Sequence, residues 1–128
     1  MRLYFEPVNL LQWNLFQKVE GIGHVECFLA TKSMNIGDIV LLHVGKHDKK
    51  YKSGIYAYGK IVKAPYILHD SPKDYCNEKL SVDVQISNIS FNEPLINEDM
   101  CKKLFHQFRR VHSIDEIASA QIQAILKL

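Results

Sequence analysis

Residues 37–45 read GDIVLLHVG and residues 53–62 read SGIYAYGKIV, and these two stretches decide the fold. As an extended strand, residues 39–44 place mainly apolar side chains on both faces, which is typical of a strand at the centre of a sheet. The second stretch follows a polar turn, so the pair predicts a hairpin. Ala57 and Gly59 share a face of the second strand. Such small residues predict either a barrel corner or a cleft where a ligand approaches the backbone closely.

Regular spacing of apolar residues predicts the other elements. Together they indicate an α+β fold, a small twisted, mostly antiparallel β-barrel flanked by helices. The loop after the hairpin is longer than ordinary connections, which makes it a candidate binding loop or lid. The predicted elements are a half-buried strand over residues 2–6 with Leu3 and Phe5 inward, a helix from about Val8 to Val19, this loop from Pro65 to Lys79, a strand over residues 80–86, a helix from Asn97 to about Arg110 and a last helix from about Ser119.

Composition predicts one domain over residues 1–128, because 47% hydrophobic and 23% charged residues are enough to build one core. The longest apolar run, residues 39–42, is far shorter than the ~20 residues of a membrane span. The first residues, MRLYFEPVN, lack the apolar core of a signal peptide, so we expect a cytoplasmic protein without a membrane partner.

The three cysteines, Cys27, Cys76 and Cys101, stand far apart in the sequence. No C-x-x-C pair or histidine at zinc-ligand spacing accompanies them, so the sequence indicates neither a disulfide framework nor a structural zinc. Buried free thiols are the expected state. We expect no metal and no cofactor.

Catalytic motifs are not recognisable in the sequence. The nearest candidates, His69-Asp70 and the segment 112–115, are commonplace combinations in predicted loops and are better explained as solvated side chains. We therefore expect a protein that is not itself an enzyme.

A lysine-rich turn joins the two central strands, and its flexible ammonium groups could contact phosphates without reading sequence. A solvated turn explains the same residues equally well. The net charge of +2 does not decide between these readings, because clustering of charge matters more than its total. The candidate phosphate-binding residues are Lys46, Lys49, Lys50 and Lys52 in the turn and Lys60 on the next strand.

Aromatic and histidine residues are candidates for a base-binding pocket. His43 points inward from the first central strand, and Tyr66 and Tyr75 lie in or beside the long loop. If they meet in space, they offer stacking faces and hydrogen-bonding groups for a planar base. The alternative for His43 is a hydrogen-bonded core residue. Trp13, off the main apolar stripe of the first helix, faces either a ligand or a second packing surface.

Several sequence landmarks are spread along the chain: Glu6-Pro7 followed by Trp13, Glu20-Gly21-Ile22, the segment Ile36–Val40, the segment Gly54–Tyr66, Val82-Asp83-Val84, Pro94-Leu95 and Ser113-Ile114. Together they resemble the EVE domain of the PUA-like superfamily over nearly the whole chain. This resemblance implies a small barrel with a cleft for a flipped, modified base, frequently used as the DNA-reading module of modification-dependent restriction systems of the McrBC kind.

Three positions depart from the family pattern: Val19 replaces a tryptophan, His24 an asparagine and His43 a tyrosine. We therefore expect a reader of a different modified base, with the base near His24, His43, Tyr66, Tyr75 and Trp13. The expected partner is double-stranded DNA with a methylated or hydroxymethylated base, and an effector nuclease or NTPase would lie in another domain or subunit. The alternatives are a modified-RNA-binding protein, a small PUA-like hydrolase using Lys60, and a protein-interaction module.

Overall fold

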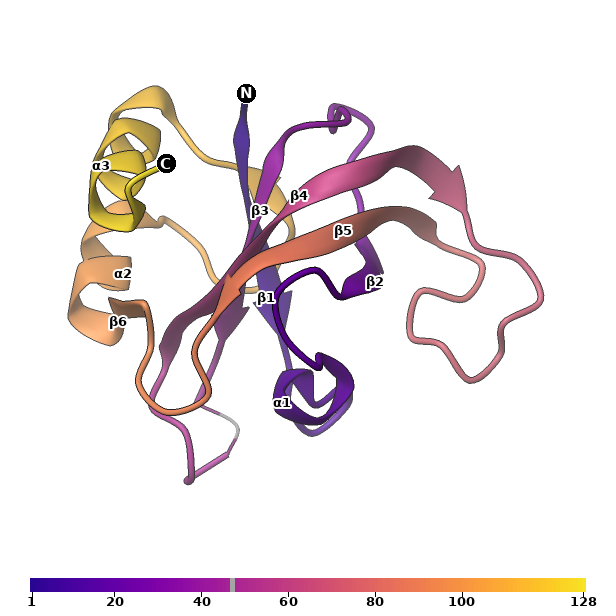
Figure 1. The fold of residues 1–128 in the computed structure, drawn as a ribbon, viewed down its shortest axis with the longest axis horizontal. Coiled ribbons are helices and arrows are strands. Elements are labelled where there is room, and N and C mark those ends of the chain that lie inside the picture. The colour runs from indigo at the N-terminus through magenta and orange to yellow at the C-terminus, as the bar shows by residue number, and fades with distance from the viewer. Residues whose placement is uncertain (47) are drawn as a thin grey trace.

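The computed structural model describes residues 1–46 and 48–128 (Figure 1). A strongly bent sheet forms the body, and three helices flank it. In chain order the elements are β1 (Leu3–Val8), α1 (Leu15–Lys18), β2 (Val25–Leu29), β3 (Ile39–Val44), β4 (Gly54–Ile67), β5 (Leu80–Ile89), β6 (Ile96–Asn97), α2 (Glu98–Leu104), β7 (His112–Ser113) and α3 (Glu116–Leu126).

The predicted central hairpin is confirmed. β3 pairs antiparallel with β4 from Ile39 opposite Lys60 to Val44 opposite Gly54, and a bulge lies between Leu42 and His43. All six residues of β3 are buried, as expected for a central strand.

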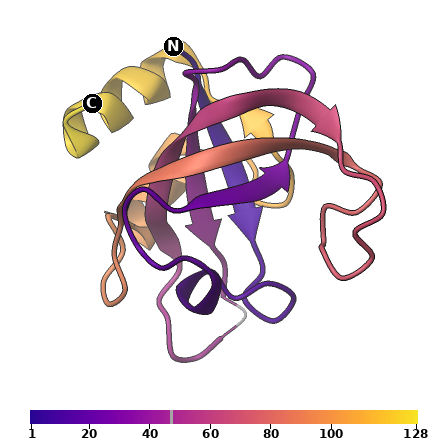
Figure 2. The same ribbon diagram turned by 45° about the vertical axis from the view of Figure 1, so that its right-hand side comes forward.

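The sheet runs in the order β2-β5-β4-β3-β1-β7, with β6 beside β4. β1 lies parallel to β3, and the other pairs are antiparallel. The α+β class is therefore confirmed. The sheet curls without closing: within the described residues, no ladder joins β2 at one end to β1 or β7 at the other (Figure 2).

Two hydrophobic cores lie on opposite faces of this sheet. The first contains Leu15 of α1 and Phe28 of β2, and the second contains Leu104 of α2 and Ile122 of α3. α2 and α3 therefore cover one face, and α1 with the segment before it covers the other, as Figure 1 shows. No helix among the described residues is long and apolar enough to cross a membrane.

The predicted helix over residues 8–19 is wrong for most of its length. Only Leu15–Lys18 are helical, and Leu11, placed on its buried stripe, is 74% exposed. Asn9 and Asn14 explain the difference, because each side chain accepts a hydrogen bond from the backbone N–H two residues later. Such local bonds favour turns and helix caps over a continuing helix.

The two C-terminal helices also differ from their predicted ends. Asn97 caps α2 as predicted, but the helix ends at Leu104. The last helix begins at Glu116, earlier than Ser119, because the Asp115 side chain accepts a hydrogen bond from the Ala118 N–H and caps it.

The small residues of β4 serve packing. A side chain at Gly59 would collide with the Gln85 carbonyl oxygen and the Val84 side chain of β5. The register between β4 and β5 shifts at this point. Gly59 thus lets two strands approach at a bend, which is the barrel-corner alternative.

Candidate functional site

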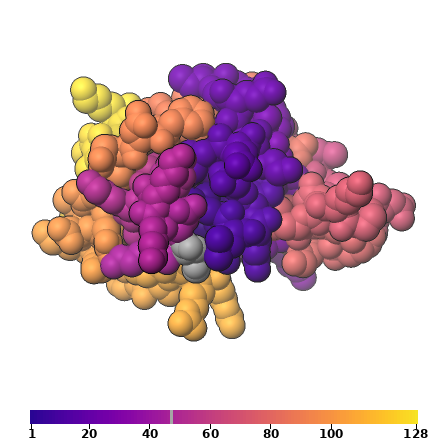
Figure 3. Space-filling model, turned by 90° about the horizontal axis from the view of Figure 1, so that it is seen from below, coloured from indigo at the N-terminus to yellow at the C-terminus, as the bar shows by residue number. Residues whose placement is uncertain are grey.

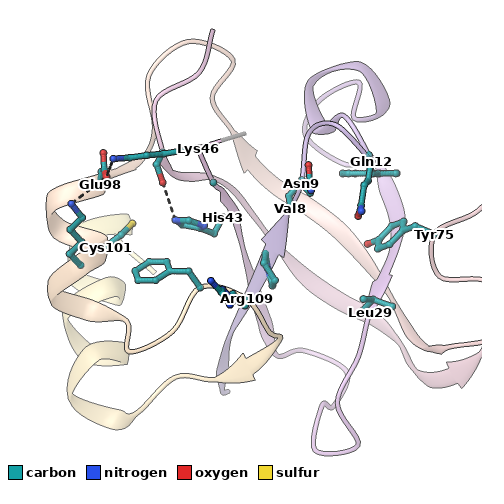
Figure 4. A pocket seen from close by; sticks show the side chains of 16 residues that line it. Val8, Asn9, Gln12, Leu29, His43, Lys46, Tyr75, Glu98, Cys101 and Arg109 are labelled. Atoms are coloured by element: carbon teal, nitrogen blue, oxygen red, sulfur yellow. Dashed lines mark hydrogen bonds and ion pairs between the residues drawn. The ribbon is translucent and has the colours of Figure 1, made fainter. Parts of the chain in front are cut away.

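A pocket of about 590 Å³ lies around the C-terminal ends of β1 and β3. Val8 and Asn9 lie in its middle (Figure 4). On one side of them are His43, Cys101 and Arg109, and on the other are Gln12, Leu29 and Tyr75. We call these the histidine half and the aromatic half of the pocket.

Trp13 and Tyr75 form the aromatic half, together with Leu29, Gln12 and Asn9. The ring centres of Trp13 and Tyr75 are 5.8 Å apart, and the Trp13 ring meets Phe28 edge-on at 5.3 Å. The Tyr75 hydroxyl donates a hydrogen bond to the Cys27 carbonyl oxygen, 3.3 Å away. Burial raises the pKa of Tyr75, so this hydroxyl stays protonated. Phe28 therefore supports the Trp13 ring and the Cys27 carbonyl holds the Tyr75 hydroxyl, while both rings line the pocket.

His43 is the centre of the histidine half, and it is only 4% exposed. Its ring lies 5.0 Å from Phe5 and 5.1 Å from Phe108. Its Nε2 atom is 3.4 Å from the Ser53 hydroxyl oxygen. His43 therefore occupies a packed, hydrogen-bonded position, which agrees with the core alternative considered above.

His24 and Tyr66 lie outside the pocket. His24 lies just before β2, and its Nε2 atom is 2.8 Å from a carboxylate oxygen of Glu26, which belongs to β2. The Tyr66 hydroxyl donates to Asp83 Oδ1 at 2.5 Å, and the Lys63 ammonium stands 4.1 Å from the Tyr66 ring centre. The structure thus brings Trp13, His43 and Tyr75 to one pocket and leaves the other two predicted residues elsewhere.

The lysines predicted to bind phosphate differ in their position and in whether they form an ion pair. Lys46 lines the pocket and lies 2.6 Å from a Glu98 oxygen, and Lys102 lies 3.3 Å from the same atom. These contacts, above all the bond from Lys46, lower the pKa of Glu98. Lys52 lies 3.3 Å from Glu93.

Lys49 and Lys50 are exposed at the tip of the turn, next to the pocket, and no ion pair is recorded for either within residues 1–46 and 48–128. His47, in the same turn, lies outside the described residues. Figure 3 shows this face, where the magenta turn adjoins the indigo N-terminal segment. Lys60 is exposed on β4 and does not line the pocket, so it has no acid partner there for the hydrolase alternative.

Glu6 is a candidate that the sequence pattern missed. Alternation placed it on the wet side of a half-buried strand, but it is 1% exposed and its Oε1 atom has no hydrogen-bond partner among the described residues. Burial, and secondly the nearby Cys27, raise its pKa well above the usual carboxyl range. The difference arises because both faces of β1 are covered: Leu3 and Phe5 lie in one core, and Tyr4 and Val8 in the other.

Comparison with known proteins gives matches at the level of structure. No protein-family model and no curated protein sequence matches the chain. Human THYN1 in complex with DNA containing 5-methylcytosine superposes with a TM-score of 0.64 at 14% identity, covering 100% of this chain and 99% of that one.

Two further solved structures have the same arrangement. A hypothetical protein from Leishmania major matches with a TM-score of 0.64 at 14% identity, over 99% of this chain and 95% of that one. A protein from Pseudomonas syringae matches with a TM-score of 0.59 at 18% identity, over 98% and 99%. This chain shares their fold, which is consistent with the PUA-like architecture that the sequence resemblance implied.

Proposed function

We propose that this protein binds double-stranded DNA carrying a modified base, and that the base occupies the aromatic half of the pocket. The observation that carries the proposal is the pair of pocket-lining rings, Trp13 and Tyr75, held 5.8 Å apart at the edge of a 590 Å³ pocket. The fold shared with THYN1, whose structure contains 5-methylcytosine DNA, supports a nucleic-acid ligand over other planar molecules.

The two rings provide contact surface for a base taken out of the duplex. Extrusion costs a few kcal/mol, and stacking on an aromatic side chain returns about 1–3 kcal/mol per base. The amides of Gln12 and Asn9 line the pocket near these rings. Gln12 can donate and accept at a base edge, and Asn9, whose oxygen already accepts from the Leu11 N–H, can donate. The site thus combines stacking with hydrogen-bonding groups.

Cations around the pocket would hold the backbone. Arg109 lines the histidine half, and Lys49 and Lys50 stand exposed on the adjoining turn. Lys46 and Lys102 share one carboxylate, Glu98, so this group of three carries a net positive charge. Contacts of this kind position DNA without reading its sequence.

More specifically, we infer an EVE-type, non-catalytic specificity module of a cytoplasmic modification-dependent restriction system. The base would be a methylated or hydroxymethylated one, flipped from the duplex. Catalysis would belong to a nuclease or NTPase in another domain or subunit. Support comes from the landmarks Glu6-Pro7 and Trp13, which resemble that family, and from a pocket built for stacking.

A binding titration tests the proposal. Fluorescence anisotropy would compare duplexes that are unmodified or carry N6-methyladenine, 5-methylcytosine or 5-hydroxymethylcytosine, all at one stated salt concentration. We expect one modified duplex to bind at least about tenfold more tightly than the unmodified one, which corresponds to about 1.4 kcal/mol. Equal affinity for all four duplexes would refute base reading. Tighter binding to a modified single-stranded RNA than to every duplex would favour the RNA alternative.

A further inference from the structure

Three side chains with metal-binding chemistry meet where the loop over residues 68–79 packs against β2. Cys27 belongs to β2, and Asp74 and Cys76 belong to the loop. The two sulfur atoms and a carboxylate oxygen all lie within 4.8 Å of one another. Cys76 is fully buried, while Cys27 and Asp74 are half-buried. The cluster can therefore be reached from solvent at Cys27 and Asp74, while Cys76 lies in the protein interior.

The loop holds two of these side chains in position through its own hydrogen bonds. Asp74 Oδ1 accepts from the Cys76 N–H at 2.8 Å, and the Asp74 N–H donates to the Ser71 carbonyl at 2.9 Å. The Lys79 N–H in turn donates to the Cys76 carbonyl at 3.0 Å. A carboxylate has two oxygens with about four lone-pair sites, so Asp74 can bind a cation in addition to accepting this hydrogen bond.

The ligand set favours a borderline-soft cation. Thiolates, imidazoles and carboxylates bind Zn²⁺, whereas Mg²⁺ and Ca²⁺ prefer oxygen ligands alone. Two thiolates bound to one tetrahedral Zn²⁺ at ~2.3 Å would be roughly 3.8 Å apart. The three ligand atoms lie within 4.8 Å of one another, which is compatible with that spacing.

We propose that Cys27, Asp74 and Cys76 bind one Zn²⁺ ion, with the fourth position open to solvent. Polar side chains lie around Cys27: the Tyr66 hydroxyl bonds to Asp83, the register partner of Cys27 on β5, and Ser81 lies on the same strand. Polar groups of this kind orient the ligands in metal sites.

Such a site would also hold one wall of the pocket. Tyr75 stands between two of the three ligands and is the only residue of the 68–79 loop that lines the pocket among the described residues. The bound metal would clamp this loop onto β2 and fix the Tyr75 ring. Figure 1 shows why a clamp matters: the loop projects from the ends of β4 and β5, away from the body of the sheet.

The direct test is titration of the full chain with Co²⁺, a spectroscopic substitute for Zn²⁺. The reduced protein is stripped with a chelator, and Co²⁺ is added until the signal saturates. We expect one Co²⁺ per chain, a sulfur-to-cobalt charge-transfer band, visible bands of tetrahedral cobalt, and loss of all of them when Zn²⁺ is added. Zn²⁺ should also raise the melting temperature of the stripped protein.

Two variants and a matched control locate the ion. Cys27→Ser should abolish the charge-transfer band or weaken Co²⁺ binding at least tenfold, and Asp74→Asn, in a half-exposed loop position, should weaken binding with the fold retained by circular dichroism. Asp70→Asn makes the same change at an exposed carboxylate of the same loop, outside the cluster, and should bind Co²⁺ like the original chain.

Two results would overturn the assignment. One is a stripped, folded protein that shows no charge-transfer band at saturating Co²⁺, including the case in which Cys27 and Cys76 form a disulfide in air instead. The other is an unchanged band in Cys27→Ser. Because the readout requires no DNA, the metal site and the proposed function can fail separately: a chain that binds Zn²⁺ but discriminates no modified base refutes only the function.

Discussion

The two halves of the pocket differ in how their rings are used. In the histidine half, His43 is enclosed by Phe5, Phe108 and Ser53, and its ring is almost fully buried. In the aromatic half, Trp13 and Tyr75 are held from behind by Phe28 and the Cys27 carbonyl and remain half-buried. The first arrangement stabilises the fold, and the second leaves surface for a ligand. Substitutions in the two halves should therefore affect different properties.

The largest effect is expected in the histidine half. His43→Ala leaves a cavity beside Phe5 and Phe108 and removes the contact to Ser53, so it should lower the free energy of unfolding by about 2–3 kcal/mol. Chemical denaturation followed by circular dichroism measures this. The ratio of affinities for modified and unmodified DNA, measured well below the melting temperature, should stay the same. A changed ratio would mean that His43 reads the base, as its place in the sequence first indicated.

Trp13→Ala tests the aromatic half. It removes one of the two lining rings and should weaken binding of the preferred modified duplex roughly tenfold, or about 1.4 kcal/mol, within the usual value of one stacked base. Binding of the unmodified duplex should change much less, so the base preference shrinks. The control is Phe91→Ala, which removes an exposed aromatic ring outside the pocket. Equal losses for modified and unmodified DNA would show that the ring does not hold the base.

Glu6 lies on the same face of β1 as the pocket-lining Val8, and it predicts a pH dependence. Its pKa is raised in the folded protein, so the folded state binds more protons than the unfolded state between the usual carboxyl pKa and the raised one. Stability from this group therefore falls as pH rises through that window. Glu6→Gln should raise the free energy of unfolding by about 1 kcal/mol at pH 8 and change it little at pH 4.

Thermal unfolding of the original protein and of the Glu6→Gln variant between pH 4 and pH 8 would measure the effect. A Glu6→Gln chain that is less stable at pH 8 than the original would show that the buried carboxylate has a stabilising partner.

The smallest effect concerns the turn at the pocket rim. Replacing both Lys49 and Lys50 by alanine should weaken modified and unmodified duplexes alike and reduce the slope of log affinity against log salt by roughly 1.8, if each lysine contacts one phosphate. Lys60→Ala, on β4 away from the pocket, is the matched control and should leave the slope unchanged. An unchanged slope in the double variant would favour the solvated-turn alternative.

The sequence was most informative where local pattern and long-range packing agree. β3 is apolar on both faces, and that pattern alone predicts a central strand and its hairpin with β4. The apolar spacing over residues 8–19 predicted too long a helix. The side chains of Asn9 and Asn14 accept hydrogen bonds from nearby backbone N–H groups, and the spacing of apolar residues carries no information about this local competition.

The candidate site was harder to predict because contacts between distant segments assemble it. Trp13 and Tyr75 meet only because a 12-residue loop over residues 68–79 folds back beside β2. The same packing draws Cys76 to Cys27, although the cysteines stand 49 positions apart in the sequence. Tyr66 was placed in the loop, but β4 continues through Ile67 and holds Tyr66 against Asp83, outside the pocket.

The parallel pairing of β1 with β3 has a consequence for synthesis. β1 precedes both of its partners in the sequence, Ile39–Val44 on one edge and His112–Ser113 on the other. Contacts of such long sequence separation form slowly, and until they form, the apolar segment Leu3–Phe5 has neither neighbour. During synthesis one edge of this strand stays unpaired until His112–Ser113 have been made, so the segment Leu3–Phe5 should be prone to aggregation and should bind chaperones during that interval.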